Sequence, residues 1–352
     1  MRFAVAAGEG MITSLRMNPR LPLLGLLLLP LVSFAAEEPR RPFVGSIDRL
    51  DPAFDKLIAA DAKIEKLAEW FVWSEGPTWF EGAVVFSDVM ANTAYRWKEG
   101  MTSAEVFLKP SGLTSSTPGI REPGSNGLAV DRQGRLLLCQ HGDRRVARLE
   151  KDGSYSVVAD RFNGKRFHSP NDLALNKSGD IYFTDPPYGL EKINDSPLKE
   201  RSFHGVYRVA AADGKVTLLT EEIMYPNGIA FSPDEKILYV ASSDSRATRV
   251  TAHEVRLDGT IANGRTFFDA QPLRKPGVRG LCDGLKVDRE GNVWATGPGG
   301  VLVISPSGKL LGRINTNEAT GNCCWGDDGS TLYITADMFL VRVKTLTKGA
   351  GW

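Results

Sequence analysis

A short unit recurs along this chain of 352 residues: an apolar run, a turn rich in Asp, Asn and Gly, and a second apolar run. Clear copies occupy residues 127–138, 172–183, 228–239 and 284–294, and looser copies occupy residues 75–86 and 322–333. The turn chemistry of each copy is typical of a β-hairpin. Six similar hairpins restrict the chain to repeat architectures.

A polar residue stands at or just before the start of every copy. These anchors are Glu75, Asn126, Asn171, Asn227, Asp283 and Asn322. Successive anchors are 39 to 56 residues apart, by subtraction of their positions. This period suits a four-stranded propeller blade with loops of variable length. We therefore predict an all-β fold, a six-bladed β-propeller of four-stranded blades over residues 65–347. A short helix is expected around residues 54–68.

Composition agrees with a single large domain. The chain is 42% apolar and contains 36 Gly and 20 Pro, which provides for a sizeable core and many turns. Net charge is only +1, and Lys and Arg form no continuous stripe. Nucleic acid and anionic membrane surfaces are therefore excluded as expected partners. We expect a monomer or weak dimer that binds a small molecule.

The N-terminus has the pattern of a signal peptide. Residues 21–32 form an apolar run that follows Arg16 and Arg20 and precedes small residues at 33–36. The run is short for a membrane span. We predict a signal peptide at 1–36, an N-terminal extension at 37–64, and export to the periplasm or medium without stable membrane insertion after cleavage. An uncleaved anchor is the alternative.

The four cysteines do not have the spacing of a zinc site. They are Cys139, Cys282, Cys323 and Cys324. A Cys-x-x-Cys pair is absent from the sequence. Buried thiols in inner strands are favoured, and a Cys282–Cys323 bridge is the alternative.

Four of the anchors predict a cation site. In a closed ring, residues at the same point of successive repeats converge on the axis, so Glu75, Asn171, Asn227 and Asp283 should meet there. Two buried carboxylates repel each other, and a divalent cation removes that repulsion. Carboxylate and amide oxygens suit a hard cation such as Ca²⁺. Either Asn alone could instead be an ordinary turn residue.

Two segments carry a family resemblance. Residues 169–189 and 225–239 resemble the family of senescence marker protein, gluconolactonase and luciferin-regenerating enzyme, and the chain is similar above all to the bacterial gluconolactonases over residues 65–343. The resemblance implies a divalent metal in the tunnel, usually Ca²⁺, with Zn²⁺, Mn²⁺, Mg²⁺ or Fe²⁺ as alternatives. Its ligands fall on Glu75, Asn171, Asn227 and Asp283, and Asp283 is the candidate catalytic residue.

One position departs from the family pattern. Animal members have an Arg two residues before the first metal-site Asn, where this chain has Ser169. Other side chains should therefore contact the substrate. The candidates are Asn171, Arg145, His141, His168 and Tyr188. For His168 the alternative is a supporting residue hydrogen-bonded to a loop carbonyl, and for Arg145 it is a surface ion pair with Asp143 or Glu150.

These features predict a carboxylic ester hydrolase. The expected reaction is metal-dependent hydrolysis of a lactone, such as gluconolactone, to the hydroxy acid, with Asp283 orienting or deprotonating the attacking water. The alternatives are a phosphotriester or aryl ester hydrolase on the same propeller and a non-catalytic binding propeller. The sequence has neither Gly-x-Ser-x-Gly nor His-Glu-x-x-His, which argues against serine hydrolases and zinc proteases of those types.

Overall fold

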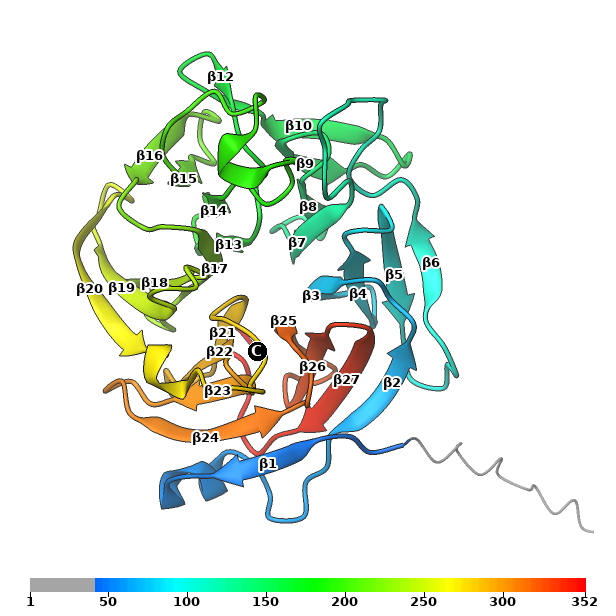
Figure 1. The fold of residues 1–352 in the computed structure, drawn as a ribbon, viewed down its shortest axis with the longest axis vertical. Helices are drawn as coiled ribbons and strands as arrows, with labels where there is room; N and C mark the ends of the chain where they lie inside the picture. Colours follow the sequence, from blue (N-terminus) through cyan, green and yellow to red (C-terminus); the bar gives the residue numbers. More distant parts are fainter. Residues whose placement is uncertain (1–41) are drawn as a thin grey trace, which may run out of the picture. The chain divides into compact units, whose positions relative to one another are not determined.

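Six antiparallel β-sheets are arranged around a common axis in the computed structural model, which describes residues 42–352 (Figure 1). The first blade is β3 (Ser74–Phe80), β4 (Ala83–Asp88), β5 (Thr93–Trp97) and β6 (Glu105–Leu108). The second is β7 (Ser125–Val130), β8 (Leu136–Gln140), β9 (Arg145–Leu149) and β10 (Tyr155–Ala159). The third is β13 (Leu173–Leu175), β14 (Ile181–Asp185), β15 (Gly205–Val209) and β16 (Val216–Thr220).

The remaining blades follow the same order from the axis outward. The fourth is β17 (Pro226–Phe231), β18 (Ile237–Ser242), β19 (Arg249–Val255) and β20 (Ile261–Asp269). The fifth is β21 (Leu285–Val287), β22 (Val293–Gly297), β23 (Gly300–Ile304) and β24 (Leu310–Asn315). The sixth begins with β25 (Thr320–Gly326), β26 (Thr331–Ala336) and β27 (Phe339–Lys344). The predicted six-bladed propeller is thus confirmed.

Short elements complete the described chain. The strands β11 (Arg161–Phe162) and β12 (Lys165–Arg166) form a small hairpin. Three single-turn 3₁₀ helices are η1 (Pro52–Lys56), η2 (Ile193–Asp195) and η3 (Gln271–Leu273). Within residues 42–352, no helix has the length and apolar character needed to cross a bilayer. The predicted signal peptide lies outside the described residues.

Two N-terminal strands complete the ring. The strand β2 (Glu65–Glu69) forms the outer edge of the sixth blade, where it pairs with β27 in the register Glu65↔Arg342 and Glu69↔Phe339 (Figure 1). The strand β1 (Ser46–Arg49) adds a fifth strand beside β24. The start of the described chain therefore adds one strand to each of the last two blades, and the pairing of β2 with β27 closes the ring.

The helix expected at 54–68 is wrong. Only η1 is helical, with Pro52 in its first turn and the Asp51 carboxylate accepting a hydrogen bond from the Ala53 amide at 2.8 Å. Residues 65–69 instead form β2. The free edge of β27 offers a ladder of backbone hydrogen bonds, and this tertiary pairing overrides local helix propensity.

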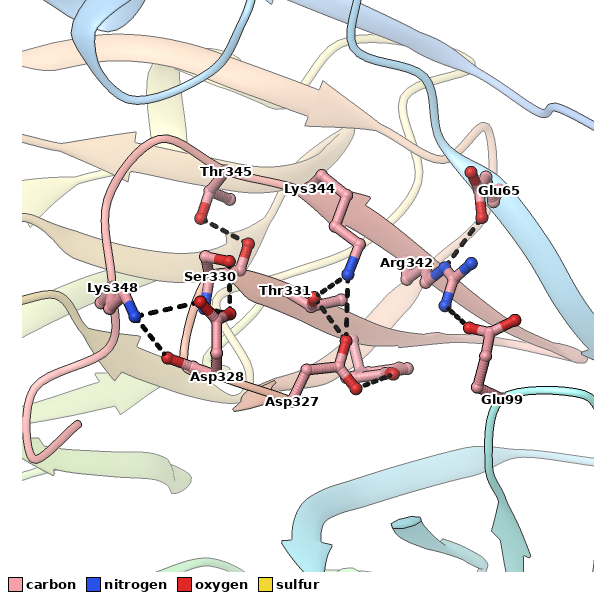
Figure 2. A network of polar contacts seen from close by, with 11 residues as sticks. Glu65, Glu99, Asp327, Asp328, Ser330, Thr331, Arg342, Lys344, Thr345 and Lys348 are labelled. Atoms are coloured by element: carbon pink, nitrogen blue, oxygen red, sulfur yellow. Dashed lines mark hydrogen bonds and ion pairs between the residues drawn. The ribbon is translucent and has the colours of Figure 1, made fainter. Parts of the chain in front are cut away.

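Polar contacts support the same closure (Figure 2). The buried Arg342 guanidinium, on β27, donates to the Glu65 carboxylate of β2 at 2.8 Å and also contacts Glu99, in the loop after β5. A second group lies on the same blade, where Lys344 donates to Asp327 at 3.1 Å and Lys348 to Asp328 at 3.0 Å. Arg342 thus connects three segments from opposite ends of the described chain.

Apolar side chains fill the space between neighbouring blades. Aromatic pairs mark these interfaces: Trp79 stacks on Tyr333 between the first and sixth blades, at 5.7 Å between centroids, and Trp294 meets Trp325 edge-on at 5.2 Å. All four cysteines are buried and unpaired. This agrees with the interpretation as buried thiols and not with a Cys282–Cys323 bridge.

Closure by β2 should contribute strongly to stability. Leu67 is buried among core residues of the first and sixth blades. Leu67→Ala should lower the free energy of unfolding by about 2–5 kcal/mol, the usual range for a buried Leu. Leu257→Ala, at a fully exposed position, is the matched control and should change it little. Equal denaturant midpoints for both variants would contradict the assigned role of β2.

Candidate active site at the ring axis

Local backbone features direct the anchors toward the axis. The inner strands β3, β7, β17 and β25 each have a β-bulge at their anchor, where the pairing register shifts. Such bulges re-aim a side chain at a strand end. A glycine follows four of the anchors. A Cβ atom on Gly76 would lie 2.0 Å from the Asn126 carbonyl oxygen, and one on Gly228 would lie 2.3 Å from that of Asp283.

These glycines allow the inner strands to touch. The amide of Gly228 donates to the Asp283 carbonyl at 3.1 Å, and the amide of Gly127 donates to the Asn171 carbonyl at 2.7 Å. Neighbouring blades are thus joined by backbone hydrogen bonds beside their anchors. Five of the six anchors line the cavity at the axis, and Asn322 is the exception.

One cavity of about 730 Å³ lies at this axis, and all six blades or their loops contribute to its wall. The structure brings all four predicted ligands to it, namely Glu75, Asn171, Asn227 and Asp283. The equivalent anchor Asn126 also lines the cavity. Its place in the repeat is equivalent to that of the predicted ligands, but it was not predicted to be one.

The sixth anchor has a different role. The amide nitrogen of Asn322 donates to the Asp172 carboxylate at 3.2 Å, which links opposite blades across the ring. The ammonium group of Lys286, on β21, lies 3.9 Å from the same carboxylate and 3.4 Å from the Asn322 amide oxygen. Asn322, Asp172 and Lys286 form a polar layer of their own, and none of them lines the cavity.

The two axial carboxyl groups are strongly perturbed. Burial raises the pKa of Glu75 to about 8, and the nearby charges of Asp172 and Glu122 act in the same direction, against a hydrogen bond from the Gly76 amide at 3.0 Å. Burial, followed by the charge of Glu75, also raises the pKa of Asp283 well above its usual range. The charge of Glu75 therefore disfavours ionisation of Asp283 in the absence of a positive charge.

Several oxygens in the cavity lack a hydrogen-bond partner. They are Oδ1 of Asp283, Oδ1 of Asn171 and Oδ1 of Asn126, all buried. The Asn227 amide is held in place, because its nitrogen donates to Ser243 Oγ at 2.9 Å. Unpaired buried oxygens are costly in a native structure and call for a positive partner. The donor set therefore fits a hard divalent cation.

The site differs from a site built on acidic and imidazole groups alone. Among residues 42–352, no three His, Cys, Asp or Glu side chains are grouped as metal ligands usually are. Any cation here would rest on two carboxylates and on neutral amide oxygens. Such a mixed oxygen set suits Ca²⁺ better than a metal that prefers nitrogen or sulfur ligands.

Tyr188, a predicted substrate contact, is part of the cavity wall. It stacks on Tyr225 with ring centroids 5.6 Å apart and planes at 12°. Burial, followed by the charge of Asp283, raises the pKa of the Tyr188 hydroxyl well above its usual range. The hydroxyl also shares a hydrogen bond with Ser243. It therefore stays protonated beside Asp283.

The two predicted histidines lie outside the cavity wall. His141 is fully buried, and its Nδ1 lies 3.0 Å from the carboxylate of Glu122, which does line the cavity. His168 is buried against His204, and neither of its ring nitrogens has a partner. Burial, followed by the nearby charge of Lys199, lowers the pKa of His168 to about 3, so its ring is neutral near pH 7.

Arg145 does not reach the cavity, which corrects the expected substrate contact at the tunnel mouth. Its guanidinium pairs with Asp143 at 2.9 Å and donates to the Gln140 side chain at 2.6 Å. It lines a separate surface depression together with Thr114 and Asp160. Arg145 begins β9, the third strand of its blade, and this position keeps it away from the axis.

Sequence reasoning missed Glu122 and Arg121. Both line the cavity from the loop between β6 and β7. They lie outside the repeated unit, so no periodic signal identified them. Ser169, the position that departs from the family pattern, is buried, donates to the Pro186 carbonyl at 2.6 Å and accepts from the Gly189 amide at 2.9 Å.

The fold and the cavity define a six-bladed β-propeller with an oxygen-rich site on its axis. Residues 73–337 match the SMP-30/Gluconolactonase/LRE-like region. The chain therefore belongs to this family, as its motifs predicted. A gluconolactonase from Zymomonas mobilis is 38% identical over 317 residues, which cover 87% of this chain and 88% of that protein.

Solved structures agree with this assignment. A gluconolactonase from Xanthomonas campestris has a TM-score of 0.74 at 32% identity, with 88% of this chain and 99% of that chain covered. The calcium-binding protein regucalcin from Agrobacterium tumefaciens has a TM-score of 0.62 at 20% identity, with 82% and 94% covered. At that identity, regucalcin shares the fold.

The raised pKa of Glu75 predicts a pH-dependent stability of the metal-free protein. Folded protein keeps the Glu75 proton up to about pH 8, whereas an ordinary Glu loses it near 4.5. The resulting stability is present below about pH 4.5 and is lost as pH rises to about 8. In chelator, the melting temperature should therefore fall across this window more steeply for wild type than for Glu75→Gln.

The same experiment with added Ca²⁺ is the control. A bound cation would compete with protons and restore stability most at the upper end of the window. Identical pH profiles for wild type and Glu75→Gln in chelator would contradict the assigned burial of this carboxyl group.

Proposed function

We propose that this protein is a lactonase that hydrolyses a sugar lactone, such as gluconolactone, to the hydroxy acid with the help of a divalent cation. One observation carries the proposal: Oδ1 of Asp283 is buried and unpaired, and it shares the axial cavity of a gluconolactonase-family chain with the unpaired amide oxygens of Asn126 and Asn171. The relative from Zymomonas mobilis, a gluconolactonase, supports the choice of substrate class.

The cation would be held by Glu75, Asn171, Asn227 and Asp283, with Asn126 beside them. Ca²⁺ is the ion that this oxygen set fits best, since it takes six to eight oxygen ligands, of which water and substrate would supply the remainder. When bound, the cation supplies Lewis-acid polarisation of the lactone carbonyl and compensates the charge that develops on its oxygen.

Asp283 is the residue best placed to activate water. Its Oδ1 has no partner, while Asn227 donates a hydrogen bond to the same carboxyl group. With the cation bound, the carboxylate would be ionised, and a second lone pair on Oδ1 could accept a proton as water attacks the carbonyl carbon. The ring carbon–oxygen bond then breaks, and the proton passes to the oxygen that leaves. Tyr188, protonated beside Asp283, can orient the substrate by donating a hydrogen bond.

Removal of the cation should abolish activity. Dialysis of the purified protein against a chelator should eliminate gluconolactone hydrolysis and lower the melting temperature, since a ligand bound to the native state stabilises it. Ca²⁺ should restore both. Metal analysis should find one ion at the axial site. Full activity in a preparation shown to contain no divalent metal would refute the proposal, and activity on paraoxon alone would favour the phosphotriesterase alternative.

Asp283→Asn should reduce turnover without unfolding the protein. The substitution keeps size and one ligand oxygen but removes the base, so turnover should fall at least about a hundredfold, the usual scale for a general base. Asp258→Asn, in an exposed turn, is the matched control and should turn over normally. Near-normal turnover of Asp283→Asn on gluconolactone would place the base elsewhere.

A further inference from the structure

A third carboxylate lines the cavity besides the two predicted cation ligands Glu75 and Asp283. Glu122 follows β6 in the loop that leads to β7, and its side chain is 12% exposed. It shares the cavity wall with Glu75, Asp283 and Tyr188, and its charge raises the pKa of each of them. Both of its oxygens have partners: Oε1 lies 2.9 Å from Arg121 and Oε2 lies 3.0 Å from His141.

These contacts give Glu122 one orientation. His141 has no exposed surface, so its ring cannot leave the carboxylate without disturbing the interior. Its backbone amide also donates to the Gly124 carbonyl at 3.1 Å, which ties the Glu122 loop to the end of β8. A carboxylate held by a buried ring and an Arg loses little entropy when it binds a ligand.

The loop is also tied to the neighbouring blade. The amides of Arg121 and Glu122 both reach the Gly189 carbonyl, at 2.8 and 3.3 Å, and Arg121 donates to the Tyr188 carbonyl at 3.3 Å. Gly189 permits this packing, because a Cβ atom there would lie 2.7 Å from Ser169 and 2.9 Å from His141. Glu122 and Tyr188 therefore form one preorganised side of the cavity.

The chemistry of this side fits hydroxyl groups. The charge of Glu122 is already balanced by Arg121, so a second cation is not required there. Each carboxylate oxygen has about two acceptor positions, and its known partner occupies one of them. The free positions can accept from neutral O–H donors, and Arg121, which is 45% exposed, can donate to a hydroxyl oxygen. Ser169 is not free to bind a substrate hydroxyl group, because its own hydroxyl donates to the Pro186 carbonyl and accepts from the Gly189 amide.

We propose that Glu122, positioned by His141 and assisted by Arg121, binds the hydroxyl groups of a polyhydroxylated lactone and selects it over a lactone that lacks them. This inference rests on the proposed lactonase function and adds a specificity site to it. It assigns Glu122 as a substrate-binding residue and His141 as a positioning residue that acts through Glu122.

The test compares two lactones of the same ring size, D-glucono-δ-lactone and unsubstituted δ-valerolactone, by their ratio of kcat/KM. In Glu122→Gln this ratio should fall about tenfold to a hundredfold, the usual range for a hydrogen bond to a charged group. Most of the change should lie in KM for the hydroxylated lactone. Glu105, on the outer strand β6, pairs with Arg96 of β5, and the control Glu105→Gln should keep the wild-type ratio.

His141 variants test the positioning role. His141→Gln keeps an N–H donor for Glu122 and should retain most of the selectivity, whereas His141→Leu should lose it with a normal melting temperature. An unchanged ratio in Glu122→Gln, or equal losses on both lactones, would overturn the inference. If wild type hydrolyses neither lactone, the proposed function fails instead, so the two failures are distinguishable.

Discussion

Repulsion between two buried carboxyl groups is the constraint around which the axis of this protein is built. Glu75 and Asp283 reach one cavity from different blades. Burial raises the pKa of both, and the charge of Glu75 raises that of Asp283 further. Only a proton or a cation can relieve this repulsion in a low-dielectric site. Because unpaired amide oxygens surround them, the arrangement favours a cation, which is also what Lewis-acid catalysis on an ester needs.

The inner strands hold the anchor side chains rigidly in place. Backbone hydrogen bonds join neighbouring inner strands beside the anchors, and glycines such as Gly76 and Gly228 leave no room for adjustment. The pairing of β2 with β27 closes the ring, so no blade can move outward alone. Lys286 balances the charge of Asp172 next to the cavity. A rigid frame of this kind allows strained electrostatics to persist at a functional site.

Much of this could be predicted from the sequence, because the repeat carries it. The six recurring hairpins indicated the six blades. Glu75 and Asp283 were identified as site candidates because a buried carboxylate is costly unless it has a partner. Features outside the repeat could not be predicted from the sequence. The segment at 65–69 has no strand partner nearby in sequence, and only the edge of β27 makes it a strand. Arg145 was a candidate to replace the family Arg that is missing at Ser169, but its place in the third strand of its blade keeps it from the axis. Glu122 lies in a loop outside the repeat.

The central claim is that Glu75, Asn171, Asn227 and Asp283 share one divalent cation. A crystal structure of active protein grown with Ca²⁺, with anomalous diffraction to identify the ion, tests it most directly. We predict a single strong peak in the axial cavity, bounded by one oxygen from each of these four side chains at about 2.3–2.6 Å, the usual Ca²⁺–oxygen range. A fully active crystal with only water among these side chains, or with the ion bound elsewhere, would contradict the account.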